Sequence, residues 1–182
     1  MIGNDIVDLR LATTQSDWQR RGWLQKIFTK SEQEVISKAT NSAYMVWKLW
    51  SMKEAAYKAH QRRFLLSPKY NPWDYICTES YVTIDMYVYQ TYTEYTDTYI
   101  HTTAFINEAN YVSRICKGAN AVIYKDILSI EIAKIKEVQI STITIEKDQN
   151  NIPFINIENK AVDIVISLSN HGDFSAFIIK KT

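Results

Sequence analysis

The chain has 182 residues, of which 46% are hydrophobic and 23% charged, and its formal net charge is +1. A single domain or two small related halves of this total length bury about 70% of their unfolded surface, so stability need not come from disulfides. The 2 cysteines, Cys77 and Cys116, match no metal-ligand spacing and predict reduced thiols. Near-zero charge and the lack of a long apolar run argue against nucleic-acid binding and membrane insertion. With no leader-like segment after Met1, we expect a soluble cytoplasmic protein.

The first eight residues predict a short buried strand that carries an acidic side chain. Ile6 and Val7 are apolar strand formers, and Gly3 allows another backbone to approach closely. Asp5 is costly to bury unless it is paired, hydrogen-bonded or bound to a metal. Asp8 suits the N-cap of a helix that begins near residue 9, and a chemical role for it remains an alternative.

A long helix is predicted over residues 41–63, because no Gly or Pro interrupts residues 41–66 and the apolar residues recur at helical intervals. Glu54 and Lys58 are four residues apart and therefore project from the same face. An ordinary surface ion pair, which contributes a few tenths of a kcal/mol, is the alternative to a chemical role.

The middle of the chain predicts a tyrosine-rich β-hairpin insertion at about residues 75–123. Apolar and polar residues alternate over 82–89 and 100–106, and the polar stretch 91–98 separates the two runs. The tyrosines favour cross-strand packing or an oligomer interface, with recognition of sugar or protein as the alternative. A turn follows at 117–120, then a helix or strand over 126–135, and strands over 138–147 and 153–157.

The last segment predicts two strands that flank a polar turn over residues 167–173. Ser169, Asn170 and His171 supply hydroxyl, amide and imidazole groups there, and Gly172 supplies backbone freedom. Such a turn suits phosphate binding, and a plain hairpin is the alternative. Taken together, these elements predict an α+β fold with an antiparallel sheet packed against the 41–63 helix.

Three of these segments, in this order, resemble the 4′-phosphopantetheinyl transferase superfamily. Gly3-Asn4-Asp5-Ile6 is similar to the family's Gly-x-Asp-Ile strand, and Trp50-Ser51-Met52-Lys53-Glu54-Ala55-Ala56-Tyr57-Lys58 is similar to its Trp/Phe-x-x-Lys-Glu-Ala-x-x-Lys helix. The segments 27–32 and 146–153 add weaker similarity. The likeness covers about residues 1–66 and 125–180.

Two positions depart from the family pattern. Asn151 replaces the usual Gly of the Gly-x-Pro turn. The holo-acyl-carrier-protein synthase branch closes with Ser-x-Ser-His, but here Asn170 follows the second Ser and the histidine comes one place later, at His171. Either a local shift lets His171 take the family role, or Asn170 makes a neutral contact instead. His101, on an alternating strand, is a third candidate.

The resemblance implies transfer of 4′-phosphopantetheine from coenzyme A to a serine of an apo acyl or peptidyl carrier protein, as in fatty acid biosynthesis, with release of adenosine 3′,5′-bisphosphate. It implies Mg²⁺ bound by Asp5 and Glu54, a proton acceptor at Glu54, and Lys58 facing the charge on the leaving group. The residues expected to contact coenzyme A are Lys53, for which simple solvent exposure is the alternative, Ser169, and Asn170 or His171.

The resemblance also leaves several points open. The family forms its active sites where two α+β units meet, either between subunits of a trimer or within one pseudo-dimeric chain, and this length is compatible with both. Two other functions remain as alternatives: a catalytically silent relative that binds coenzyme A, and a binding module that uses the tyrosine-rich hairpin. The sequence does not identify the carrier as fatty-acid, polyketide or peptide-synthetase type.

Overall fold

The computed structural model describes residues 1–107, 110–118 and 121–181, and it confirms the predicted α+β fold. Its helices are α1 (Leu9–Gln15), α2 (Trp23–Ile27), α3 (Lys30–Lys38), α4 (Ser42–Phe64) and α5 (Ala121–Lys136), with short 3-10 turns η1 (Pro72–Asp74) and η2 (Ile140–Thr142). Its strands are β1 (Ile2–Asp8), β2 (Ile76–Thr78), β3 (Tyr81–Ile84), β4 (Tyr87–Tyr95), β5 (Tyr99–Phe105), β6 (Tyr111–Lys117), β7 (Ile143–Lys147), β8 (Pro153–Ile157), β9 (Lys160–Val162), β10 (Ile166–His171) and β11 (Phe174–Lys180).

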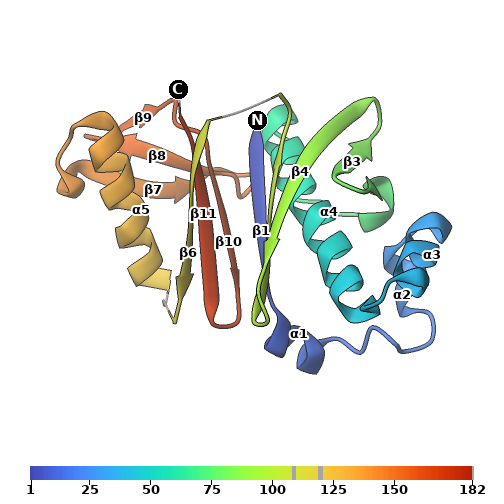
Figure 1. Ribbon diagram of the computed structural model, residues 1–182. Helices are drawn as coiled ribbons and strands as arrows, with labels where there is room; N and C mark the ends of the chain where they lie inside the picture. The colour runs from blue at the N-terminus through green and yellow to red at the C-terminus, as the bar shows by residue number, and fades with distance from the viewer. Residues whose placement is uncertain (108–109, 119–120, 182) are drawn as a thin grey trace.

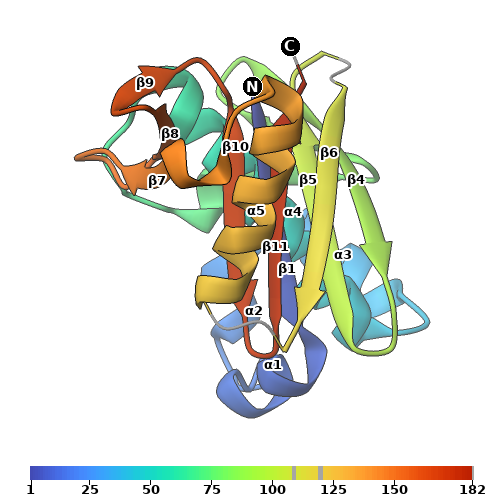
Figure 2. The same ribbon diagram turned by 90° about the vertical axis from the view of Figure 1, so that its left-hand side faces the viewer.

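These strands form three antiparallel sheets, which are sheet A (β1-β5-β4-β3-β2), sheet B (β10-β11-β6) and sheet C (β7-β8-β9). Sheets A and B lie next to each other in the middle of the molecule, and α4 and α5 lie on opposite outer sides (Figure 1). Figure 2 shows α5 in front of β10 and β11. No helix in the described part of the chain is long and apolar enough to cross a membrane.

The two halves of the chain share one order of elements. Each half begins with a strand, continues through a long helix, and ends in antiparallel strands of which the last pairs with the first: β1 with β5, and β6 with β11. Each half has its own apolar core, under α4 and under α5. A smaller cluster of Ile6, Phe174 and Ala176 joins the halves, because Ile6 points from β1 toward sheet B.

Helix α4 packs directly on the backbone of β1. A Cβ on Gly3 would overlap the carbonyl oxygen of Ala55 and lie 2.6 Å from the backbone nitrogen of Ala59. Both alanines are fully buried, so small residues on the helix and a glycine on the strand make this close approach possible. Since side chains alternate along a strand, Gly3 and Asp5 face the same way, and Asp5 therefore points toward α4.

The predicted long helix is confirmed as α4, and Asn41 caps it by accepting a hydrogen bond from the N–H of Tyr44. The predicted strand over 153–157 is confirmed as β8, and residues 126–135 lie within α5. The strand predicted over 138–147 begins only at Ile143, because residues 140–142 form a 3-10 turn.

The prediction of one hairpin over residues 75–123 is corrected by the structure. Residues 82–89 are not one strand, since Asp85 has a φ of 51° and turns the chain between β3 and β4. Residues 91–95, predicted to separate the strands, belong to β4. The strand β6 pairs in sheet B rather than sheet A. Of the predicted turn at 117–120, residues 119 and 120 lie outside the described residues.

The C-terminal segment also differs from its prediction, because most of the expected polar turn is strand. β10 extends to His171, and Gly172 and Asp173 alone make the turn to β11. Gly172 has a φ of 58°, a conformation that favours glycine. Residues 167, 169 and 171 therefore share one face of β10 rather than clustering in a loop.

Candidate active site

A cleft of about 460 Å³ lies where the two halves of the chain meet. Its walls come from β1, from the α1–α2 region, from α4 and from β10. It gathers six of the predicted site residues within one chain, and these are Asp5, Glu54, Lys58, Ser169, Asn170 and His171. The N-terminal strand, the central helix and the C-terminal strand therefore contribute to the same site.

Lys58 is tied to β1 and β10 rather than to its helical neighbour Glu54. Its Nζ donates to the Asp5 carboxylate over 3.1 Å, to the Asn4 carbonyl oxygen over 3.0 Å and to the Ser169 hydroxyl over 3.1 Å. An ammonium has three donors, so these partners satisfy it. The alternative of a Glu54–Lys58 surface pair is absent from the ion pairs of the described residues, and Lys58 is instead partly buried.

The Ser169 hydroxyl completes this network. It donates to the Asp5 carboxylate over 3.0 Å and accepts from Lys58 and from the backbone N–H of Ile6. A hydroxyl has one donor and two acceptor lone pairs, so its capacity is used. In this arrangement Ser169 orients Asp5 and Lys58.

The carboxyl group of Glu54 lacks such partners. No hydrogen bond or ion pair joins it to another side chain in the described residues, and the α4–β1 contact largely removes it from water. Burial raises the pKa of Glu54 to about 7, the negative charge of Asp5 acts in the same direction, and the ammonium of Lys58 opposes both. A carboxyl group with this pKa exchanges a proton near neutral pH, as a general base must.

The side chains of β10 bind the edge of β1 that does not pair with β5. Backbone N–H groups of Asn4, Ile6 and Asp8 donate to Ser167 Oγ, Ser169 Oγ and His171 Nδ1 over 3.0, 3.1 and 2.9 Å. The period of two on β10 matches the period of two on β1, so alternate residues of one strand meet alternate N–H groups of the other. This contact fixes the distance between the two halves at the cleft.

His171 and Asn170 both border the cleft. His171 Nδ1 accepts from Asp8, which leaves the proton on Nε2, and Nε2 lies 3.2 Å from the side-chain oxygen of Gln15. Asn170 is exposed. Both residues therefore remain candidates for contact with a ligand, and the one-residue shift places the histidine, not the asparagine, on the face of β10 that holds β1.

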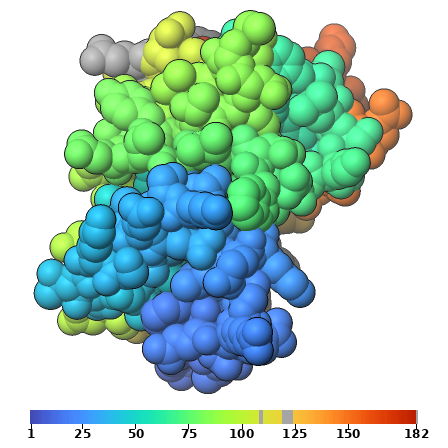
Figure 3. Space-filling model, turned by 90° about the vertical axis from the view of Figure 1, so that its right-hand side faces the viewer, coloured from blue at the N-terminus to red at the C-terminus, as the bar shows by residue number. Residues whose placement is uncertain are grey.

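Sequence reasoning missed much of the apolar wall of the cleft. Trp47 and Trp50 line it from α4, and Trp23 lines it from α2. The N-terminal segment that includes α2 forms one end of the molecule, which is blue in Figure 3. The ring centroids of Trp23 and Trp47 are 6.0 Å apart. The sequence does contain a signal for Trp47 and Trp50, because both precede Glu54 at helical intervals and so share its side of the helix. Nothing in the sequence marks Trp23.

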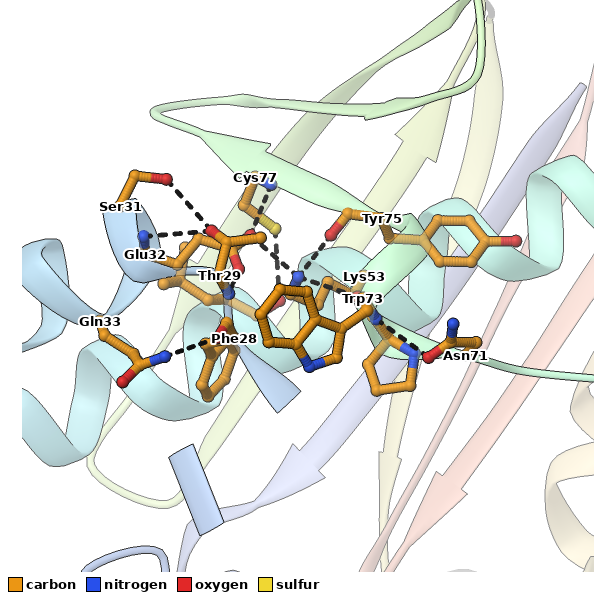
Figure 4. Close-up of polar contacts among 12 residues, drawn as sticks. Phe28, Thr29, Ser31, Glu32, Gln33, Lys53, Asn71, Trp73, Tyr75 and Cys77 are labelled. Atoms are coloured by element: carbon orange, nitrogen blue, oxygen red, sulfur yellow. Dashed lines mark hydrogen bonds and ion pairs between the residues drawn. The ribbon is translucent and has the colours of Figure 1, made fainter. Parts of the chain in front are cut away.

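The prediction that Lys53 contacts the nucleotide is wrong. Its side chain is 0% exposed and forms an ion pair with Glu32 over 2.9 Å (Figure 4). It also donates to the backbone carbonyl oxygens of Pro72 and Tyr75. Lys53 and Glu54 are consecutive on a helix, so they point about 100° apart, and only Glu54 reaches the cleft.

The Glu32 carboxylate connects three elements of secondary structure. One carboxylate oxygen accepts from Lys53 and from the N–H of Cys77 over 2.7 Å, and the other accepts from the N–H of Thr29 over 2.8 Å (Figure 4). The Thr29 contact is half of a capping box at the start of α3. The ion pair therefore locks α3, α4 and β2 together behind the cleft.

Two further predicted candidates lie outside the walls of the cleft. Asp8 caps α1 by accepting from the N–H groups of Arg10 and Leu11, as predicted. Burial opposes its charged form, but hydrogen bonds from the N–H groups of Asp173, Leu11 and Arg10 hold the pKa of Asp8 below its ordinary value. His101 is buried in sheet A, where its Nδ1 lies 2.9 Å from Glu94. His101 therefore lies within sheet A and does not line the cleft.

The donor set of the cleft fits a hard divalent cation bound through few protein ligands. Asp5 and Glu54 are two carboxylates in one cavity, and the negative charge of Asp5 helps to raise the pKa of Glu54. The described residues hold no cluster of three or more His, Cys, Asp or Glu side chains. Mg²⁺ typically takes one or two carboxylates and completes its shell with phosphate and water, so this pair suits Mg²⁺ better than Zn²⁺ or Ca²⁺.

A second, smaller cleft of about 210 Å³ continues from the first on the other side of Lys58. Arg62, Lys147 and Asn151 line it, and Arg62 is held there by donating to the Pro153 carbonyl oxygen over 2.6 Å. The second cleft is basic, whereas the first has an aromatic wall.

A model of the 4′-phosphopantetheinyl transferase superfamily matches residues 1–104, more than half of the chain. Two solved structures are similar to it. The holo-[acyl-carrier-protein] synthase of Helicobacter pylori, solved in complex with coenzyme A, is 14% identical over 98% of this chain and 97% of that one, with a TM-score of 0.29. The Thermotoga maritima holo-[acyl-carrier-protein] synthase is 8% identical over 85% and 81%, with a TM-score of 0.40. No curated protein matches.

Proposed function

The chain belongs to the 4′-phosphopantetheinyl transferase superfamily, and from this membership we propose that it transfers 4′-phosphopantetheine from coenzyme A to a serine of an apo acyl or peptidyl carrier protein. The observation that carries the proposal is the cleft itself. Asp5, Glu54 and Lys58 of the family segments border it together with the C-terminal residues Asn170 and His171.

In this reaction the serine hydroxyl oxygen attacks the β-phosphorus of coenzyme A. A new P–O bond to serine forms, the bond between this phosphorus and the bridging oxygen breaks, and adenosine 3′,5′-bisphosphate leaves. Glu54 is the carboxylate placed to accept the serine proton as general base. Lys58 is the ammonium next to Asp5, and it faces the negative charge that develops on the leaving bisphosphate.

Asp5 and Glu54 are the residues that would hold Mg²⁺ in this site. When bound, the ion would neutralise phosphate charge during transfer. The chain's own contribution is orientation, because Ser169 and the carbonyl oxygen of Asn4 keep Lys58 and Asp5 in place.

The two clefts on either side of Lys58 suggest how coenzyme A lies. The basic cleft with Arg62 and Lys147 suits the pyrophosphate next to Lys58, because guanidinium and ammonium groups bind phosphate. Asn170 and His171 in the first cleft are then placed for the 3′-phosphate. The aromatic wall formed by Trp23, Trp47 and Trp50 suits the less polar pantetheine arm.

Mass spectrometry of apo carrier proteins tests the proposal. Fatty-acid, polyketide and peptide-synthetase carriers would each be incubated with the protein, coenzyme A and Mg²⁺. We expect one or more of them to gain the phosphopantetheine mass, and we expect Glu54→Gln to abolish that gain. Binding of coenzyme A with no gain on any carrier would identify a catalytically silent relative. If the protein neither binds coenzyme A nor modifies any carrier, the tyrosine-bearing strands remain as the candidate functional surface.

A further inference from the structure

Tyr70 lies in the segment between α4 and η1, and its ring packs across the turn of α4 that carries Glu54. Its centroid is 6.0 Å from that of Trp50 and 4.9 Å from that of Tyr57. Trp50 is four residues before Glu54 and Tyr57 is three residues after it, so both share the side of the helix on which Glu54 lies. A ring in contact with both therefore covers the Glu54 turn.

The hydroxyl of Tyr70 is buried and has no hydrogen-bond partner in the described residues. A buried polar group without a partner is destabilising, so its presence calls for an explanation, such as an ordered water, an ion or a functional role. Glu54, on the same turn, likewise lacks a partner there. The Tyr70 ring thus covers the turn of α4 whose carboxyl group, like the Tyr70 hydroxyl, has no side-chain partner among the described residues.

The charge environment keeps this hydroxyl a donor. Burial raises the pKa of Tyr70, and the negative charges of Glu54 and then Asp5 raise it further, so both carboxylates act on the hydroxyl. Because the oxygen is enclosed, a ligand in the cleft does not reach it. A carboxylate that rotates about its side-chain torsions does.

We propose that Tyr70 is a positioning residue of this site: when a divalent cation is bound, its hydroxyl donates a hydrogen bond to the Glu54 carboxylate and fixes the direction in which Glu54 faces Asp5. The inference rests on the proposed function, since it assumes that Asp5 and Glu54 bind the cation. Groups that hydrogen-bond to ligating carboxylates set the orientation of the ligand, and their loss weakens metal binding.

Tyr70→Phe tests the proposal, with Tyr75→Phe as the matched control. Tyr75 belongs to the same aromatic cluster, with its ring centroid 5.7 Å from that of Tyr70, and both variants keep the ring and remove one hydroxyl. The probe is Mn²⁺, whose free concentration is measured by electron paramagnetic resonance, with and without coenzyme A. We expect Tyr70→Phe to raise the dissociation constant for Mn²⁺ about tenfold or more and Tyr75→Phe to leave it unchanged.

Thermal unfolding without divalent cations provides the second measurement. The Tyr70 hydroxyl has no partner in this state, so we expect Tyr70→Phe to unfold at the same temperature as the parent or higher. A lower midpoint than that of Tyr75→Phe would show a structural hydroxyl and overturn the proposal. Equal Mn²⁺ dissociation constants for Tyr70→Phe and the parent would also overturn it. A parent protein that binds no Mn²⁺ would instead reject the metal site of the proposed function, and this inference with it.

Discussion

Lys58 forms its ion pair with Asp5, on a strand 53 residues away, with Nζ 3.1 Å from the carboxylate oxygen. The Glu54–Lys58 spacing on α4 therefore does not produce an intrahelical pair. It places an ammonium and a largely unpartnered carboxyl group side by side at the mouth of one cleft. Because Lys58 is paired with Asp5 and not with Glu54, mutation of Lys58 and mutation of Glu54 test two separate roles.

Lys58→Ala should reduce the rate of transfer at least about 100-fold, because a positioned charge that acts in the transition state contributes about 3 kcal/mol or more. The same variant should bind Mn²⁺ as well as the parent or more tightly, since the ammonium no longer competes for Asp5. Single-turnover kinetics and Mn²⁺ titration measure the two effects. Near-parental turnover would remove Lys58 from the mechanism.

Glu54→Gln should abolish transfer and yet stabilise the fold at alkaline pH. The folded pKa of about 7 lies above the ordinary value of 4.5, so the folded state holds this proton more tightly than the unfolded state. Stability is therefore highest below about pH 4.5 and falls as pH rises to about 7. The difference amounts to at most about 3 kcal/mol.

Urea denaturation between pH 4.5 and pH 8, without divalent cations, measures this effect. The parent should lose stability relative to Glu54→Gln as the pH rises from 4.5 to about 7, and the two curves should run parallel from there to pH 8. Parallel curves over the whole range would show that Glu54 titrates normally and is not prepared as a base.

Gly3→Ala should weaken the fold and the site together. The added methyl group would overlap the backbone of α4 at Ala55 and Ala59, so the helix must move away from β1. Such overpacking costs about 1–3 kcal/mol. Because Asp5 is on the strand and Lys58 is on the helix, the displacement should also lower turnover at temperatures where the variant is folded. Thermal unfolding and single-turnover kinetics measure the two effects, and parental values for both would show that α4 tolerates the added methyl group.

Lys53→Met should destabilise the protein without altering coenzyme A affinity. Removal of the ammonium leaves Glu32 buried and unpaired, and breaking a buried pair in this way costs about 3–5 kcal/mol. Lys38→Met is the matched control, since the Lys38 side chain is 80% exposed and its contact with Glu34 is 3.9 Å long. Thermal unfolding and coenzyme A titration below the midpoint distinguish this role from a nucleotide contact, which would instead change the affinity.

His171→Ala should raise the KM for coenzyme A more than Asn170→Ala does. The His171 ring is held in place by Asp8 and Gln15, so it loses less freedom than the exposed Asn170 side chain when it binds the 3′-phosphate. The variant should also discriminate less between coenzyme A and its 3′-dephospho form. Loss of the contact with the Asp8 N–H should cost about 1 kcal/mol of stability in addition. Unchanged discrimination would leave His171 with its role in joining β10 to β1 and return the phosphate contact to Asn170.

The sequence alone determined the features that depend on neighbouring residues. The long helix and the cap at Asp8 follow from local propensity and from a side chain that binds nearby N–H groups. The family motifs identified Asp5, Glu54 and Lys58, because that chemistry needs those residue types at fixed spacing. The same motif predicted that Lys53 contacts the ligand, and the structure corrects this prediction.

Only the tertiary structure decided which faces of these elements meet. The partner of Lys53 is Glu32, and the partner of Lys58 is Asp5, and neither pairing leaves a local signal because both depend on how α4 packs on other elements. The polar C-terminal residues read as a turn, yet they form strand β10, since their hydroxyl and imidazole groups bind the N–H groups of a strand more than 160 residues away. Whether each of these side chains faces the ligand, lies in the core or binds a neighbouring strand depends on the distant segment that it packs against. Sequence spacing does not contain that information.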